Sequence, residues 1–117
     1  MVRPRDTRAI SWVKAARKAF EDFPQEVQHD VLAALTIVAD GGFPSIAKPL
    51  TGVGPGIYEL ALRYRTDAYR TIYAIQFEDA LWVVHAFQKK SKTGVATPRQ
   101  EIDLALERIK RLKKLLK

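Results

Sequence analysis

The feature that most constrains this chain is a run of three β segments in its middle, joined by very short connections. The first, IYELALRYR at 57–65, has apolar or aromatic residues at every second position, which is typical of a strand with one buried face. The next two, AYRTIYAIQF at 68–77 and LWVVHAFQK at 81–89, are dense in aromatic and β-branched residues. The short polar connections suit hairpins, so we expect an antiparallel meander.

Two helices are predicted ahead of this sheet. In VKAARKAFEDFP, apolar residues recur at helical spacing until Pro24 ends the segment. Pro24 then suits the first position of a longer helix, which Gly41 and Gly42 terminate. The apolar stripe of this second helix consists of Val27, Val31, Ala34, Leu35 and Val38. We also expect a short strand around Ile10 to Val13 and a Gly- and Pro-rich connection at 41–56.

A third helix is predicted at the end of the chain. Thr97 suits its N-cap, Pro98 its first position and Gln100 the third position of a capping box. Its apolar stripe consists of Ile102, Leu106, Ile109, Leu112 and Leu116, opposite a basic face. Residues 1–117 therefore read as one α+β domain, in which an N-terminal helical hairpin packs on a three- to four-stranded antiparallel sheet, with a C-terminal amphipathic helix.

The charge of the chain is concentrated in its last quarter. The formal net charge is +7, yet residues 1–88 hold ten basic and ten acidic residues, whereas residues 89–117 hold ten basic and three acidic ones. This asymmetry favours a polyanionic partner such as RNA, although an anionic protein groove or a merely solvated basic tail is also compatible with it. There is no cysteine, which excludes disulfides and thiolate metal sites, and no apolar run of membrane-spanning or signal-peptide length. We expect a cytoplasmic protein that does not bind membranes.

Several segments, in this order, resemble one family. They are ISWVKAARKAF…FPQEV, AKPLTGVGPGIYEL, AYRTIYAIQF and LWVVHAFQKKSKTGVATPRQEIDLALERI, of which HAFQKKSKTG followed by TPR and EI is the most specific. The chain is similar to the phage Gp49-like, HigB-type branch of the RelE/ParE toxin superfamily, and the resemblance runs over nearly the whole chain. It implies a RelE-like fold and a metal-independent endoribonuclease that cuts translated mRNA on the ribosome. It also implies a small helix-turn-helix antitoxin as partner.

Four residues are candidates for RNA scission, which needs a base for the 2′-hydroxyl, positive charge at the phosphate and a proton for the leaving oxygen. Arg70 matches the strand arginine of the superfamily and can grip two phosphate oxygens. Lys89 and Lys90 follow the last strand, where the superfamily often carries cations near the scissile phosphate. We expect all three to be exposed. His85 is a fourth candidate, but its apolar surroundings favour a packed, neutral imidazole.

Other residues are expected to support RNA binding or the site itself. Arg63 and Arg65 share one strand, and Lys48 and Lys92 lie in loops, so we expect these four to contact the RNA backbone. Glu59 is predicted to pair with Arg63 or Arg70 across strands. The tyrosines could stack on bases, but most are expected to pack in the core. No residues have metal-ligand spacing, so we expect neither a metal nor a small-molecule cofactor.

The resemblance leaves an alternative function open. ParE-like members of the superfamily poison DNA gyrase by binding it, without cutting RNA, and a chain of this fold could also have lost toxicity. The loop lysines and Arg70 favour the nuclease, whereas the lack of an obvious general base favours the binder. Fold alone does not separate these functions.

Overall fold

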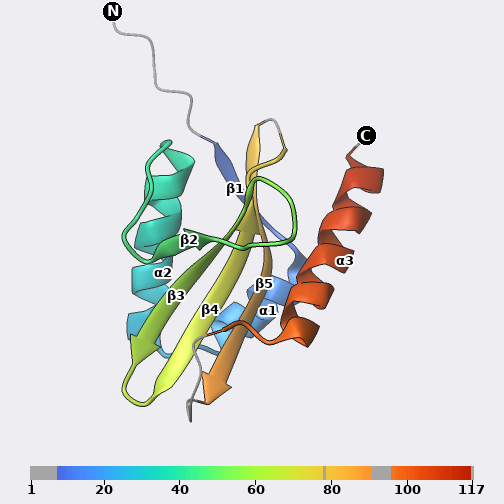
Figure 1. Ribbon diagram of the computed structural model, residues 1–117. Coiled ribbons are helices and arrows are strands. Elements are labelled where there is room, and N and C mark those ends of the chain that lie inside the picture. The colour runs from blue at the N-terminus through green and yellow to red at the C-terminus, as the bar shows by residue number, and fades with distance from the viewer. Residues whose placement is uncertain (1–7, 78, 91–95, 117) are drawn as a thin grey trace, which may run out of the picture.

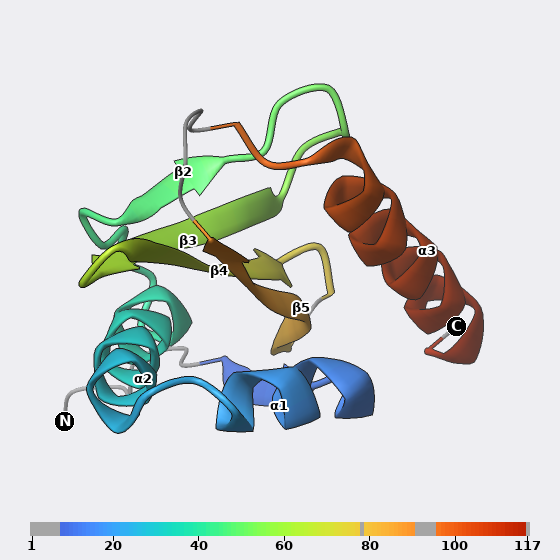
Figure 2. The same ribbon diagram turned by 90° about the horizontal axis from the view of Figure 1, so that it is seen from below.

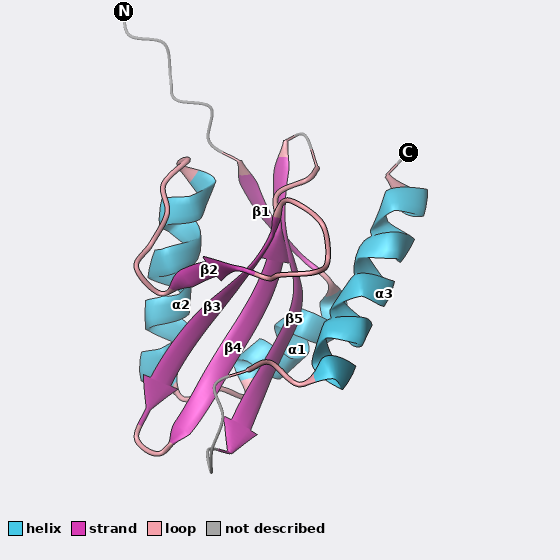
Figure 3. Cartoon of the chain, viewed as in Figure 1, coloured by secondary structure: helices cyan, strands magenta, loops and turns pink. Residues whose placement is uncertain are grey.

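The computed structural model describes residues 8–77, 79–90 and 96–116 and contains a mixed sheet with three helices (Figures 1 and 3). Its elements follow in the order β1 (Ala9–Trp12), α1 (Lys14–Glu21), α2 (Gln25–Ala39), β2 (Ala47–Pro49), β3 (Ile57–Tyr64), β4 (Asp67–Ala74), β5 (Ala80–Lys90) and α3 (Arg99–Leu115). The α+β class, both N-terminal helices, the three central strands and the terminal helix agree with the sequence predictions. Among the described helices, none is both long enough and apolar enough to cross a membrane.

The sheet has five strands in the order β1-β5-β4-β3-β2, one more than the largest number expected. Strands β2 to β5 are antiparallel to their neighbours, as the meander predicts, whereas β1 pairs with β5 in parallel. The short strand β1 lies where the sequence indicates, and β2 is the addition. It has only three residues, ends in a proline and lies within the Gly- and Pro-rich connection, so no two-residue periodicity marks it.

The helices cover the two faces of the sheet unequally. Helices α1 and α2 lie on one face, and α3 lies on the other (Figure 2). The core under α1 and α2 includes Leu60, Tyr73 and Leu81, while the core under α3 includes Ile72 and Val84. The central strand β4 is buried from its second residue to its last, because both of its faces are covered.

The C-terminus of α2 is closed by the glycines that the sequence indicates. The N–H of Gly41 donates to the carbonyl of Val38 at 2.9 Å, and the N–H of Gly42 donates to that of Ile37 at 2.8 Å. Together with the positive φ of Gly41, 93°, these bonds form a Schellman motif. A side chain at position 41 would be strained at this φ, so the glycine fixes where the chain leaves the helix.

Strand β5 contains a β-bulge that changes which face its second half presents. Tyr73 of β4 pairs with Val83, but its neighbour Ile72 pairs with His85, so Val84 has no partner on β4. Before the bulge, Val83 packs under α1 and α2; after it, His85 shares the α3 face with Ile72. The carbonyl of Val84 accepts a hydrogen bond from Arg108 Nη1 at 3.0 Å.

The predicted capping box at the start of α3 is wrong. The N-cap is Pro98, the helix begins at Arg99, and no side chain caps it. The hydroxyl of Thr97 is instead bonded to two buried residues of the sheet, as described below. A charge-assisted bond in a buried site outweighs a cap bond at the surface, which explains the difference. At the other end, Leu116 of the predicted stripe is half exposed, whereas Ile109 and Leu112 are buried.

Two leucines of α2 give a matched test of this packing. Leu35 is fully buried between α2 and the sheet, while Leu32 is 43% exposed on the same helix. We expect Leu35→Ala to lower the free energy of unfolding by about 2–5 kcal/mol, because it leaves a cavity in the core. Leu32→Ala should change it by about 0.5 kcal/mol or less. Urea unfolding measures both, and equal effects would contradict the placement of α2.

Candidate active site

The α3 face of the sheet gathers charged side chains in adjacent rows at the C-terminal half of β5. The strand register aligns Arg63, Ala68 and Lys89 in one row across β3, β4 and β5. The next row is Ala61, Arg70 and Phe87, and the third is Glu59, Ile72 and His85. Residues two apart on a strand share a face, so three predicted site residues, Arg70, His85 and Lys89, lie on one surface.

Arg70 and Glu59 form a buried ion pair that a third residue completes. Arg70 Nη1 donates to Glu59 Oε1 at 3.3 Å and to Thr97 Oγ1 at 3.1 Å. The Thr97 hydroxyl donates in turn to Glu59 Oε2 at 2.5 Å. The Arg70 side chain is only 6% exposed and that of Glu59 is fully buried. The predicted pairing of Glu59 with Arg70 is therefore confirmed, whereas the expectation that Arg70 is exposed is wrong, because it compensates a buried carboxylate.

This triad lies beside an open pocket of about 290 Å³. Residues from three regions line the pocket: Lys48, Pro49, Leu50 and Thr51 from β2 and the connection after it, Glu59 from β3, and Ala96, Thr97 and Ile102 from the approach to α3. Lys48 lies opposite Glu59 in the register between β2 and β3. A cation, a carboxylate and a hydroxyl thus meet at one hollow, and an anionic group entering it would approach Arg70 across Thr97.

His85 is held as a neutral imidazole by two residues of α3. Arg108 Nη1 approaches His85 Nδ1 at 3.1 Å, and a guanidinium can only donate, so Nδ1 is the unprotonated nitrogen. His85 Nε2 then carries the proton and donates to Glu101 Oε1 at 2.6 Å. Burial lowers the pKa of His85, although the bond to Glu101 opposes this, and the charge of Arg108 lowers it further. The ring also stacks on Phe87 with centroids 5.3 Å apart. These contacts agree with a packed, neutral histidine.

The two lysines at the end of β5 point to opposite faces of the sheet. Lys89 pairs with Ala68 on the α3 face and donates to the carbonyl of Ala96 at 3.1 Å. Lys90 pairs with Asp67, which belongs to the face of α1 and α2, and is exposed. The structure therefore brings Lys89 to Arg70 but leaves Lys90 on the other side. Lys92 lies outside the described residues.

The remaining predicted RNA contacts surround this face at its exposed margin. Arg63 is exposed on β3 next to Ala68, and Lys48 is exposed on β2. Arg65 lies in the turn between β3 and β4 with a φ of 58°, and its guanidinium lies 5.2 Å from the centroid of the Tyr64 ring. All four tyrosines, at positions 58, 64, 69 and 73, pack on the α1 and α2 side, so the expectation that most serve the core is confirmed.

Three contributors to this site were not recognised in the sequence, and all come from α3 or the residues just before it. Thr97 bonds the ion pair, while Glu101 and Arg108 hold His85. For the two residues within α3 the spacing carries a signal, since positions 101 and 108 are seven apart and so lie along one side of the helix. Only the bulge in β5, however, turns His85 toward that side. Among the described residues no group of histidines and carboxylates could hold a metal.

Comparisons with known proteins give one family and one fold. The family model for phage-derived Gp49-like proteins matches residues 18–110. A free double arginine-to-alanine mutant of the E. coli toxin RelE superposes with a TM-score of 0.65 at 20% identity, covering 88% of this chain and 98% of that one. The isolated E. coli RelE toxin gives 0.58 at 19% identity, covering 90% and 98%.

A third structure, the RelBE2 toxin-antitoxin complex of Mycobacterium tuberculosis, gives a TM-score of 0.50 at 17% identity over 73% of this chain and 94% of the matched one. At these identities the likeness shows the RelE fold. A search of curated proteins finds no match.

The buried ion pair predicts a non-additive pair of substitutions. Glu59→Leu leaves the guanidinium of Arg70 buried without its carboxylate, so we expect it to lower the free energy of unfolding by about 3–5 kcal/mol. Glu59→Leu/Arg70→Met removes both charges and should regain most of that loss. Urea unfolding of wild type, of these two variants and of Arg70→Met gives a complete double-mutant cycle. Additive losses would mean that the two charges do not interact.

The state of His85 predicts a pH dependence of stability. Because the pKa of His85 is lowered in the folded protein, the unfolded chain binds a proton here at a higher pH than the native state. The contribution of neutral His85 is fully present above about pH 6.5 and is lost as the pH falls through the pKa of the folded state. Wild type should therefore lose more stability than His85→Gln between about pH 7.5 and 5. Thermal melts at several pH values measure this dependence. If the stability of wild type and of His85→Gln changed equally with pH, the assignment of a neutral His85 would be contradicted.

Proposed function

This chain belongs to the family of phage-derived Gp49-like proteins, and from that membership and its RelE fold we propose that it is the toxin of a type II toxin-antitoxin system. The finer activity that we propose is ribosome-dependent cleavage of translated mRNA without a metal. The observation that carries it is the arrangement of the α3 face, where Arg70 and Lys89 lie on adjacent strands and the residues that bond Arg70, Glu59 and Thr97, line an open pocket. Two cations on neighbouring strands of a rigid sheet suit a phosphate whose charge grows during scission.

We propose that Lys89 and Arg70 both stabilise the scissile phosphate, each in a different way. Lys89 lies near the end of β5, so the strand fixes the position of its Cα while its ammonium group can reach the phosphate backbone of a bound RNA. Arg70 is oriented by Glu59 and Thr97, which leaves the guanidinium little rotational freedom. A preorganised charge of this kind stabilises the transition state without reorganising during the reaction. Lys90 lies on the far face and is not part of this assignment.

His85 has a different proposed role from the cations. It is neutral, and its two nitrogens are already bonded to Glu101 and Arg108. We therefore assign it to positioning α3 against the sheet rather than to proton transfer. The other cations at the margin, Lys48, Arg63 and Arg65, would attract RNA through its backbone, irrespective of sequence.

The proposed partner is a small antitoxin protein, with the ribosome and mRNA as targets. One of the similar solved structures is a toxin-antitoxin complex, which supports an antitoxin for this chain as well. A helix-turn-helix type remains the expectation from the family resemblance. A cognate antitoxin should both relieve growth arrest and raise the melting temperature of the purified toxin.

Neighbouring lysines on opposite faces give the sharpest test of this function. We expect Lys89→Ala to lower mRNA cleavage by about 10²-fold or more, because the transition state loses a charge, and to leave the melting temperature nearly unchanged. Lys90→Ala removes an equal charge from the adjacent position but from the other face, so cleavage should stay within about threefold of wild type. Inducible expression with mapping of mRNA 5′ ends measures both.

Two outcomes would contradict the proposal. Equal activity of Lys89→Ala and wild type would exclude the α3 face as the site of scission. Growth arrest with intact mRNA and a DNA-damage response would instead indicate a gyrase poison. Because Arg70 is buried, its alanine variant would confound stability with activity, so Arg70→Lys is the better probe.

A further inference from the structure

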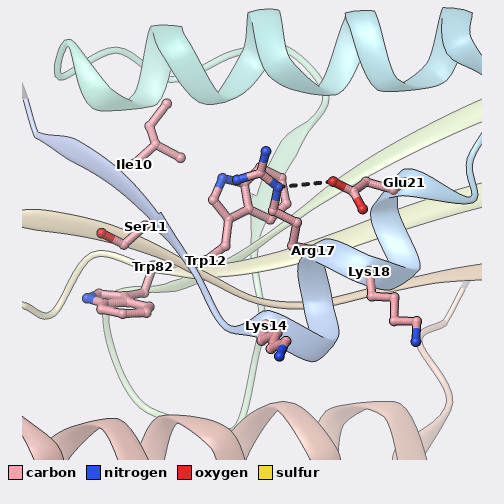
Figure 4. Close-up of a pocket in the computed structure, with 8 residues that line it drawn as sticks. All are labelled: Ile10, Ser11, Trp12, Lys14, Arg17, Lys18, Glu21 and Trp82. Atoms are coloured by element: carbon pink, nitrogen blue, oxygen red, sulfur yellow. Dashed lines mark hydrogen bonds and ion pairs between the residues drawn. The ribbon is translucent and has the colours of Figure 1, made fainter.

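A groove lies at the edge of the sheet opposite β2, away from the pocket that Glu59 and Thr97 line, although Arg108 borders it. Two pockets of about 720 and 450 Å³ adjoin there and share Trp12, Lys14 and Trp82. The larger is lined by β1, α1 and Trp82 (Figure 4), and the smaller extends from the start of α1 to α3. We call this surface the tryptophan groove. Both of the chain's tryptophans line it.

The groove runs along an open strand edge. Strand β1 is the last strand of the sheet and pairs only with β5 among the described strands. The N–H groups of Ala9 and Val13 point inward, to the carbonyls of Asp79 and Val83. By alternation, the N–H groups of Ile10 and Trp12 point outward, along the larger pocket. An open edge of this kind offers backbone hydrogen bonds to an added segment of chain.

The charge of the groove is positive. Five basic residues line it, Lys14, Arg17, Lys18, Arg108 and Arg111, against Glu21 and Glu107. Both acidic residues are engaged in ion pairs, with Arg17 and Arg111 respectively. Within the described part of the chain, Lys14 and Lys18 take part in no ion pair.

Helix α1 adds to this positive field. It begins at Lys14, in the groove, with no acidic residue in its first turn and no side-chain cap. The partial positive charge of the helix N-terminus therefore has no acidic side chain of its own first turn beside it, and Lys14 adds to it there. Lysines and helix terminus together favour carboxylates in whatever binds here.

The part of the groove next to α3 is apolar. Leu104 and Leu115, which are 40% and 77% exposed, line it together with Val13 and Trp82. Large exposed apolar side chains beside a cationic strip indicate a ligand that carries both acidic and apolar groups.

We propose that the tryptophan groove binds an acidic segment of a partner protein, laid along β1 with its apolar side chains toward α3. The proposal rests on the proposed function in one respect, namely that the partner is the antitoxin. RNA suits the groove less well, because the Trp12 ring already contacts Phe20, with centroids 4.9 Å apart, and the Arg17 guanidinium, 5.8 Å from its centroid. These contacts reduce the ring face that a base could stack on. The chain's own residues 1–7 are a poor candidate for the ligand of this groove, because they include two arginines and the groove is positively charged.

The two tryptophans provide a direct probe of occupancy. With any tryptophan of the partner replaced by phenylalanine, the tryptophan emission of the complex comes from Trp12 and Trp82 alone. The test titrates full-length toxin with the product of the gene adjacent to its own, purified separately, and follows this emission. We expect a blue shift on binding, because the segment removes water from the indole rings.

A charge-reversal pair and a matched control locate the binding. Lys14→Glu/Lys18→Glu changes exposed residues of the groove, and we expect it to weaken affinity by about tenfold or more. Lys110→Glu/Lys113→Glu makes the same change in charge on exposed positions of α3 outside the groove, and affinity should stay within about twofold. Circular dichroism confirms that both variants are folded.

The outcomes separate this proposal from the function on which it rests. The partner could bind and relieve toxicity, yet bind both double variants with equal affinity or leave the emission unchanged. Either result would overturn the proposed binding surface, while the partner would still be the antitoxin. No binding and no relief of toxicity would count against the proposed antitoxin and the groove's assignment together. A single-stranded RNA that shifts the emission, and that the groove variant no longer binds, would show that the ligand is nucleic acid and also overturn the proposal.

Discussion

The extra residue in β5 decides which side chains meet α3. If β5 alternated without a bulge from Leu81 onward, His85, Phe87 and Lys89 would face α1 and α2, where Leu81 and Val83 pack. With Val84 inserted, they face α3 instead, next to Arg70 on β4. Arg108 holds the bulge against α3, since it bonds both the Val84 carbonyl and His85. A one-residue shift in register thus creates both the cationic face and the contact that holds α3 to it.

The triad of Glu59, Arg70 and Thr97 ties the approach to α3 to the sheet at a second point. Thr97 follows residues 91–95 in sequence and belongs to no strand, yet it bonds both members of the ion pair. A fully buried carboxylate needs its charge compensated, which holds Arg70 in place, and Thr97 satisfies the second oxygen of that carboxylate. For the proposed phosphate site, this means that Arg70 is oriented by its surroundings. Its charge is also partly offset by Glu59, which leaves Lys89 as the more accessible cation.

Local signals in the sequence predicted the elements well and their faces poorly. The helix stripe of α2, its glycine stop and the alternation in β3 each depend on neighbours within one element, so the pattern alone reveals them. The bulge and the loss of the capping box depend on contacts far apart in the chain, such as Val84 with Arg108 and Thr97 with Glu59. The same limit applies to the site. Arg70 and Lys89 became candidates through the family resemblance and the pairing of Glu59 through residue type, whereas the opposite directions of Lys89 and Lys90 follow only from the register.

The surplus of positive charge in residues 89–117 does not form one surface. Lys89 lies on the face of the proposed active site and Lys90 on the opposite face. On α3, Arg108 turns inward to the sheet, Arg111 lines the tryptophan groove, and other basic residues of the helix are exposed to solvent. A charge count along a sequence therefore indicates a preference for anions but not how many binding surfaces share it. Here the same cations are divided between a site suited to phosphate and a groove suited to carboxylates. Helix α3 and the residue Thr97 just before it contribute to both, since Thr97 and Glu101 bond residues of the proposed site and Arg108 and Arg111 line the groove. The packing of α3 on the sheet therefore sets the geometry of each.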